Sequence, residues 1–395
     1  MVLSRTAALM TASAPSAAAA VNDRTLTELR GEVRAFLRDE LAQGRFTPSC
    51  DSWMSGCDPE FSKRVALHGW LGMTMPLEYG GHARSPLERF VVSEEMLAAG
   101  APVAAHWIAD RQMAPGILAH GTQAQKSRYL PAIAAGEAFF AIGMSEPDSG
   151  SDLAGIRTCA KDLGDSWRLS GTKVWTTQAH NSHAMVVLAR TDGRPEDRQQ
   201  GLSQFIVDLP HPDVEIRPIR SIDGEAHFNE VIFHDAVLPA DALLGVRGAG
   251  WAQVMGELAY ERSGPERYLS TMPLLRAWAD RLRRGETTDA QRVTLGNLTA
   301  HAWALRHMSW SVAQELAAGR KPDVLAAMVK DAGSSFEGEL VEAIRSSSGV
   351  TARRDEQDPF ATLLAGAVLH TPAFTLRGGT NEILRGIVAR GLGIR

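Results

Sequence analysis

The spacing of hydrophobic residues changes twice along this chain, from helical to strand-like and back to helical. From Thr25 to about residue 131, apolar residues such as Leu26, Leu29 and Val33 recur at steps of three and four, which is the spacing of helices with one buried face. Thr25 followed by Glu28 has the form of a capping box, so we expect the first helix to begin there. Further helices are predicted at 86–99 and 123–135, with turns at 76–81 and 121–122.

After about residue 138 the apolar runs become short and are separated by Gly, Asp, Pro and Asn clusters, which is typical of strands. The predicted strands are 167–170, 184–189, 205–208, 214–217 and 230–233. Short strands at this spacing indicate a small β-barrel or sandwich. From residue 250 the helical period returns in long stretches, which indicates a helix bundle. Its helices are predicted to open at Trp251 and to include 295–318, 324–344 and 359–368.

The pattern predicts an α+β protein with three parts in the order helices, strands, helices. We expect a disordered tail over 1–22, an all-helical domain over 23–138, a β-barrel domain over 139–247 and a helical bundle over 248–395. The first twenty residues also fit a transit peptide, because they are rich in Ala and Ser and contain no acidic residue. A chain of 395 residues is long enough for several packed domains, and so for a large buried cofactor site.

Composition excludes several classes of function. The formal net charge is -5 and the basic residues form no stripe, which argues against nucleic acid as a partner. The three cysteines have spacings that match no disulfide or zinc framework, which favours a reducing compartment. No run is apolar enough for a membrane span, and we expect no metal. A cytoplasmic bacterial protein is the interpretation we favour over a mitochondrial matrix protein.

One glycine-rich segment, Gly245–Gly250, invites a dinucleotide-binding interpretation. It follows no strand–turn–helix unit with an acidic residue downstream, so it fails the context that such a fingerprint requires. We interpret it as a turn into the helix at Trp251. The chain also contains no phosphate-binding Gly-Lys-Ser/Thr loop and no nucleophile elbow.

Four segments in a fixed order resemble signatures of the acyl-CoA dehydrogenase family. They are Ile142-Gly-Met-Ser-Glu-Pro-Asp-Ser-Gly-Ser-Asp152, Gly171-Thr-Lys-Val-Trp-Thr-Thr177, Asn229-Glu-Val-Ile-Phe233 with Val237-Leu-Pro239, and Gly379-Thr-Asn-Glu-Ile383. Weaker similarity extends over about 25–395. The resemblance implies a helical domain, a small β-barrel and a C-terminal four-helix bundle, with FAD as cofactor.

The resemblance also implies which residues contact the flavin. Trp175 and Thr177 match the pair that packs on the ring and approaches its N5 edge, where an aromatic and a hydroxyl suit an amphipathic ring. Gly150 and Ser151 would let the chain approach phosphate or pantetheine closely, so Ser151 is also a substrate-binding candidate. The full set of cofactor-binding candidates is Ile142, Met144, Ser145, Gly150, Ser151, Trp175, Thr176, Thr177, Thr380, Asn381 and Glu382.

The family's reaction requires a base, and many members place a glutamate directly before the C-terminal Gly-Thr. Here that position is Gly378, which has no carboxylate but retains an N–H that could bind the thioester oxygen. A branch of the family carries its glutamate on the helix after the β domain, just before an arginine. Glu261 and Arg262 match that pair, so Glu261 is the candidate base and Arg262 a candidate substrate contact. Glu257 and Glu266 are competing carboxylates.

The resemblance implies α,β-dehydrogenation of an acyl-CoA to a 2,3-enoyl-CoA, with flavin N5 as hydride acceptor and an electron-transfer flavoprotein as acceptor of the electrons. The missing side chain at Gly378 favours a bulky or branched acyl group. Alternatives are an acyl-carrier-protein dehydrogenase, an acyl-CoA oxidase, or a non-catalytic subunit. Segments 281–291 and 344–349 depart from those that hold the FAD pyrophosphate and adenine in the family. A homodimer, a homotetramer and a hetero-oligomer are therefore all compatible with the sequence.

Overall fold

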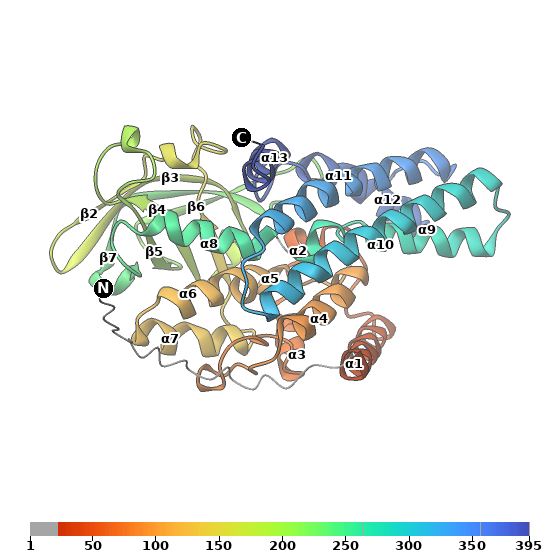
Figure 1. Cartoon of the computed structure of the whole chain (residues 1–395), viewed down its shortest axis with the longest axis horizontal. Helices are drawn as coiled ribbons and strands as arrows, with labels where there is room; N and C mark the ends of the chain where they lie inside the picture. The colour runs from red at the N-terminus through yellow and green to blue at the C-terminus, as the bar shows by residue number, and fades with distance from the viewer. Residues whose placement is uncertain (1–22, 263, 356, 395) are drawn as a thin grey trace, which may run out of the picture.

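The computed structural model describes residues 23–262, 264–355 and 357–394, without the side chains of 257–262. The chain begins with a layer of helices. Figure 1 shows most of these helices along one side of the molecule. Capping boxes at Ser85 and Thr122 begin α4 and α7. The elements are α1 (Asp23–Ala42), α2 (Ser52–Ser55), α3 (Pro59–Leu67), the 3₁₀ turn η1 (Leu77–Tyr79), α4 (Pro86–Ala98), α5 (Ala104–Ile108), the π-helical turn η2 (Ala109–Met113), α6 (Ala114–His120) and α7 (Gln123–Ala134).

The capping box predicted at Thr25 is wrong. Helix α1 already includes Asp23 and Arg24, so Thr25 lies inside the first turn rather than at the N-cap. Glu28 instead accepts a hydrogen bond from Arg24 Nε at 2.9 Å, one turn earlier on the same face. A Thr-x-x-Glu pattern inside a helix has the same spacing as one at its start, so the sequence alone could not separate the two.

Eight strands form one sheet with the order β6-β7-β3-β2-β4-β5-β8, and β1 pairs in parallel with β4. All five predicted strands are present. The three that the pattern missed, β1, β2 and β8, have only two to four residues, too few to show alternation. The strands are β1 (Phe140–Gly143), β2 (Cys159–Asp162), β3 (Ser166–Thr177), β4 (Ala184–Arg190), β5 (Leu202–Asp208), β6 (Val214–Ile219), β7 (Phe228–Pro239) and β8 (Leu243–Leu244).

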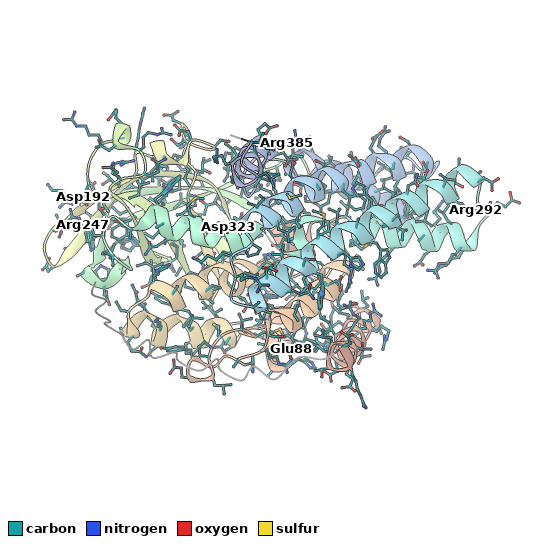
Figure 2. All side chains as sticks on the ribbon, viewed as in Figure 1. Glu88, Asp192, Arg247, Arg292, Asp323 and Arg385 are labelled. Carbon is teal, nitrogen blue, oxygen red and sulfur yellow. The ribbon has the colours of Figure 1, made fainter. Side chains whose placement is uncertain are left out.

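The loop after β8 fixes where the chain leaves the sheet. Gly245 and Gly248 have φ of +77° and +82°, a region that glycine adopts without steric cost. Between them Arg247 is bonded to Asp192 at 2.8 Å and to Asp162 at 3.1 Å, and Figure 2 shows Arg247 and Asp192 together at the end of the sheet. The segment is a turn into α8, as the failed dinucleotide fingerprint indicated.

Helices form the rest of the chain; the first of them lies beside the sheet, and the long ones extend away from it (Figure 1). The three long stretches predicted there are α10, α11 and α12, and α9 and α13 pack with them. Buried residues of the bundle and of the first helices share one core, which includes Phe61, Trp107, Trp278 and Phe336. The elements are α8 (Gly250–Arg262), η7 (Pro265–Arg267), α9 (Met272–Arg284), α10 (Asp289–Ala317), α11 (Asp323–Ser347), α12 (Pro359–His370), η8 (Thr371–Ala373) and α13 (Asn381–Gly391).

Candidate active site

The segment after β1 is fixed to β3 by a buried ion pair. Lys173 Nζ is 2.8 Å from Glu146 Oε1 and donates to the Met144 carbonyl at 3.0 Å. Glu146 also accepts hydrogen bonds from the N–H groups of Arg157 and Thr158 at 2.7 and 2.9 Å. Burial lowers the pKa of the fully buried Lys173 to about 8, against the opposing charge of Glu146. Met144 is thereby held at a defined position beside β3.

Trp175 presents its ring beside that segment. The Val174 N–H donates to the Ser145 carbonyl at 2.9 Å, so the two candidate flavin segments are neighbours. Trp175 has φ +59° at a register shift of β3, and 58% of it is exposed. Its ring meets the edge of Phe228 at 5.9 Å. A large aromatic held out from the sheet by a left-handed backbone is suited to cover a flat apolar ligand.

The other candidates of these two segments differ in exposure. The side chain of Thr176 is fully buried and its hydroxyl has no hydrogen-bond partner among the described residues, whereas Thr177 is half-buried. Ile142, Met144 and Ser145 are also half-buried. Gly150 and Ser151 are exposed, and a Cβ built on Gly150 would meet no atom within 4 Å. The space next to Gly150 is therefore open on this chain's own side.

The C-terminal loop before α13 contains two glycines in the left-handed region, Gly378 at φ +69° and Gly379 at φ +89°. Thr380 is the N-cap of α13 and its side chain accepts from the Ile383 N–H. Among the described residues, none accepts a hydrogen bond from the N–H of Gly378. That N–H is therefore available to a ligand, as an oxyanion-binding donor must be.

Asn381 and Glu382, also predicted to contact the cofactor, lie on α13. The Asn381 side chain is buried and bonded to α11: it accepts from Lys330 Nζ at 3.3 Å and donates to Ser335 Oγ at 3.1 Å. Glu382 is exposed at the first turn of the helix. Asn381 thus joins two helices of the bundle, which a motif comparison could not distinguish from a cofactor contact.

Glu261 and Arg262 lie in the last turn of α8, but their side chains, and that of Glu257, are outside the described residues. Glu266 is described: it is buried in η7, and its Oε2 lies 3.3 Å from the guanidinium of Arg111 in the π-helical turn. Arg111 also donates to Ser93 at 3.1 Å. The Glu266 carboxylate is buried against Arg111 rather than free to reach a substrate, which leaves Glu261 and Glu257 as candidate bases.

Arg377, the residue directly before Gly378, belongs to a cluster of buried charged side chains that no sequence motif predicted. Arg377 donates both terminal nitrogens to Asp51, and His370 lies 3.4 Å from Asp51 and 3.5 Å from Asp223. Burial would raise the pKa of Asp51, but the charge of Arg377 and the contact with His370 hold it well below its usual range. The cluster joins residues of all three parts of the chain.

His370 makes stability depend on pH. Burial would lower the pKa of His370, but the carboxylates of Asp51 and Asp223 outweigh it and raise that pKa above its usual value. The stabilisation is therefore complete below the unfolded-state pKa of about 6.5 and is lost as the pH rises through the folded-state pKa. We expect the melting temperature of wild type to exceed that of His370→Gln most at pH 5.5, and the gap to shrink by pH 8.5. A gap that stays constant across this range would contradict the assignment.

The described residues fit the ring of FAD better than its tail. Trp175 and the Ser145 segment offer the ring an apolar face and main-chain groups. In the segments that would reach the tail, Gln291 is engaged within the chain: it caps α10 and donates to the Ser347 carbonyl at 2.9 Å. Arg281 lies over the Phe360 ring and 3.8 Å from Asp358. This chain's own groups at these positions are thus already partnered.

Helices of membrane-spanning length and apolarity are absent from the described part of the chain.

Three family models match successive parts of the sequence: the N-terminal domain of the acyl-CoA dehydrogenases at residues 23–137, the middle domain at 141–236 and the C-terminal domain at 248–393. Acyl-CoA dehydrogenase IpdE1 of Mycobacterium tuberculosis is 35% identical over 379 residues, which are 92% of this chain and 96% of that protein. Acyl-CoA dehydrogenase FadE29 of the same organism is 33% identical over 382 residues, 92% of this chain and 95% of that protein.

Solved structures agree with the sequence relatives. The Tcur3481-Tcur3483 steroid ACAD superposes with a TM-score of 0.83 at 26% identity, over 95% of this chain and 99% of that chain. The ChsE4-ChsE5 complex from Mycobacterium tuberculosis gives a TM-score of 0.80 at 26% identity, over the same shares of the two chains. The predicted order of helical domain, β domain and helical bundle is confirmed.

Proposed function

The chain belongs to the acyl-CoA dehydrogenase family, and on that premise we propose that it oxidises a bulky or branched acyl-CoA to the 2,3-enoyl-CoA. Members of this family are flavin-dependent oxidoreductases that bind FAD. The observation that carries the proposal is Trp175, which is 58% exposed beside the Ser145 segment. Phe228 contacts only part of its ring, and the exposed remainder is an apolar face that a flavin ring would cover.

Two groups of this chain would act on the thioester. Glu261 takes the proton from the carbon next to the carbonyl, and the Gly378 N–H donates to the carbonyl oxygen, where negative charge develops. The electron pair of the broken C–H bond forms the new C=C bond as the β-hydrogen leaves with its own pair. FAD, when bound, would supply the two-electron oxidant that takes up this hydrogen with its electron pair. Ser145, Trp175 and Thr177 would hold the ring, and an electron-transfer flavoprotein would receive the electrons.

The substrate proposal rests on side-chain volume and on the relatives. Many family members have a glutamate where this chain has Gly378, and its absence enlarges the space beside the loop. One of the solved relatives at 26% identity is described as a steroid ACAD. A polycyclic acyl group is the substrate class that both observations favour, with Arg262 and Ser151 as contacts to the CoA portion.

A second subunit would complete the cofactor site. Gln291 and Arg281 are partnered within this chain, so the adenine half of FAD needs donors from elsewhere. The two solved relatives at 26% identity have two-protein names, Tcur3481-Tcur3483 and ChsE4-ChsE5. These names favour a partner of different sequence over a second copy of this chain.

Anaerobic flavin reduction across a panel of acyl-CoAs tests the function. Protein purified with added FAD is expected to be yellow, and to be bleached at least about tenfold faster by a ring-bearing acyl-CoA than by a straight-chain one of equal carbon number; one methylene alone is worth about ten- to two-hundredfold in such pockets. Oxygen consumption with peroxide release would indicate an oxidase instead. Protein that stays colourless even when purified together with its partner subunit would indicate a non-catalytic subunit.

A further inference from the structure

We propose that Asp51 and Arg377 are positioning residues for the oxyanion-binding N–H of Gly378, so that the N-terminal helical domain sets the geometry of a loop in the bundle. This inference rests on the proposed function, because it concerns the thioester oxygen of that reaction. Arg377 is the residue directly before Gly378, and any rotation of its peptide redirects the Gly378 N–H.

The Asp51–Arg377 ion pair is bidentate. Nη1 of Arg377 is 2.5 Å from Asp51 Oδ2 and Nη2 is 2.6 Å from Oδ1, the two-point arrangement that fixes orientation as well as distance. Asp51 is 1% exposed. The guanidinium also lies over the rings of Trp53 at 4.6 Å and Phe374 at 5.2 Å. Few directions of movement are left to Arg377.

The side chain of Asp51 contacts Arg377 instead of capping its own helix. It occupies the N-cap of α2, where an aspartate normally accepts a hydrogen bond from its own helix, yet its side chain makes no capping bond. Its backbone has φ +58°, and its N–H donates to the Ser270 carbonyl at 2.8 Å. A non-glycine residue in that region is held there by its surroundings, as is common where geometry serves function.

The loop is held on its other side too. Lys330, fully buried in α11, donates to the Gly379 carbonyl at 2.8 Å. Gly378 therefore lies between two anchored residues, and its N–H has no acceptor among the described residues. Two successive glycines at positive φ would otherwise be the most mobile part of the segment.

The Asp51–Arg377 pair is also connected, through a series of side chains, to Trp175, which is proposed to cover the flavin ring. The ring of His370, which lies 3.4 Å from Asp51, is 6.2 Å from the ring of His227. The His227 ring is tilted by 48° against Phe228 at 4.4 Å, and Phe228 contacts Trp175. One contiguous set of side chains thus relates the ring-covering tryptophan to the oxyanion loop.

The test measures oxyanion stabilisation without turnover. Acetoacetyl-CoA loses its α-proton to form an enolate with a distinct ultraviolet absorbance, and a donor at its thioester oxygen lowers the pH midpoint of that ionisation. On the FAD-loaded protein, Arg377→Gln and Asp51→Asn are expected to raise the midpoint by about one to two pH units. That corresponds to the ten- to hundredfold loss expected from a misplacement of about 1 Å. When an acyl-CoA substrate is used in place of acetoacetyl-CoA, we expect kcat of the two variants to fall by the same factor while KM changes little.

Controls separate this role from a structural one. Arg385 lies on α13 just beyond the loop (Figure 2), and Arg385→Gln removes its ion pair with Asp331 of α11. This variant should leave the midpoint unchanged. If Arg377→Gln does not fold, Arg377→Lys takes its place, because lysine keeps the positive charge. Lysine still loses the two-point contact with Asp51, so we expect a smaller rise of the pH midpoint. His370→Gln, measured alongside, gives the contribution of His370 alone. The other titratable groups that face the pair are His227, Asp223 and Glu337.

Two results would overturn the inference. Folded, flavin-containing Arg377 and Asp51 variants with the wild-type midpoint would show that the pair does not position Gly378. A wild-type protein whose bound ligand ionises at the same pH as free acetoacetyl-CoA would instead remove the oxyanion role of Gly378, and with it the proposed function on which this inference rests.

Discussion

Glu261→Gln is expected to retain FAD and to reduce it about 10²–10⁴-fold more slowly under anaerobic conditions with a substrate acyl-CoA. The range is the contribution of a positioned general base, and glutamine has the same shape but accepts no proton. Stopped-flow absorbance of the flavin measures the rate. Substrate binding, followed by perturbation of the flavin spectrum, should change little, because the loss occurs in the transition state.

Glu266→Gln is the matched control for that variant. Glu266 is buried against Arg111, so its replacement leaves the guanidinium without its carboxylate and should lower the melting temperature while flavin reduction stays within about tenfold of wild type. The opposite pattern, with reduction lost in Glu266→Gln and kept in Glu261→Gln, would move the base to Glu266 and refute the assignment.

Lys173→Met is expected to lose both stability and flavin. The substitution leaves the Glu146 carboxylate buried with only the Arg157 and Thr158 N–H groups, and breaking one partner of a buried pair costs about 3–5 kcal/mol. It also removes the donor to the Met144 carbonyl, so the segment beside the flavin ring loses its fixed position. Thermal unfolding and the flavin content of purified protein measure the two effects.

Arg247→Met provides the comparison for a surface pair. Arg247 bonds to Asp192 and Asp162 at the exposed end of the sheet (Figure 2), and exposed pairs are worth about 0–1 kcal/mol. Equal losses of melting temperature in Lys173→Met and Arg247→Met would contradict the argument that burial makes the Lys173–Glu146 pair special.

The sequence predicted the elements whose pattern is local and long. Residues 295–318 and 324–344 show a helical period over many turns, and the structure has α10 and α11 there. The two-residue strand β8 and the π-helical turn at 109–113 have no such pattern, since each depends on what packs against it. The start of α1 was missed because Thr25 and Glu28 carry a spacing that also occurs inside helices.

Some residues of the candidate site could be predicted from sequence motifs and others could not. Trp175 and Ser145 belong to contiguous motifs, and the structure brings their segments together. Asn381 belongs to a motif as well, but its side chain bonds to α11. The Asp51–Arg377 pair could not be predicted, because ion pairs between distant residues leave no spacing to recognise. The only signal near it is the adjacency of Arg377 to Gly378.

The distance along the chain between these two residues has a consequence for synthesis. Asp51 and Arg377 are 326 positions apart, and at roughly 5–20 residues per second the ribosome needs tens of seconds to pass from one to the other. During that time the N-terminal helices can fold, but Asp51 has no guanidinium to offset its burial. The region around α2 is therefore completed only after translation reaches the last turn before α13, which makes the thioester-binding loop one of the final parts of the nascent protein to form.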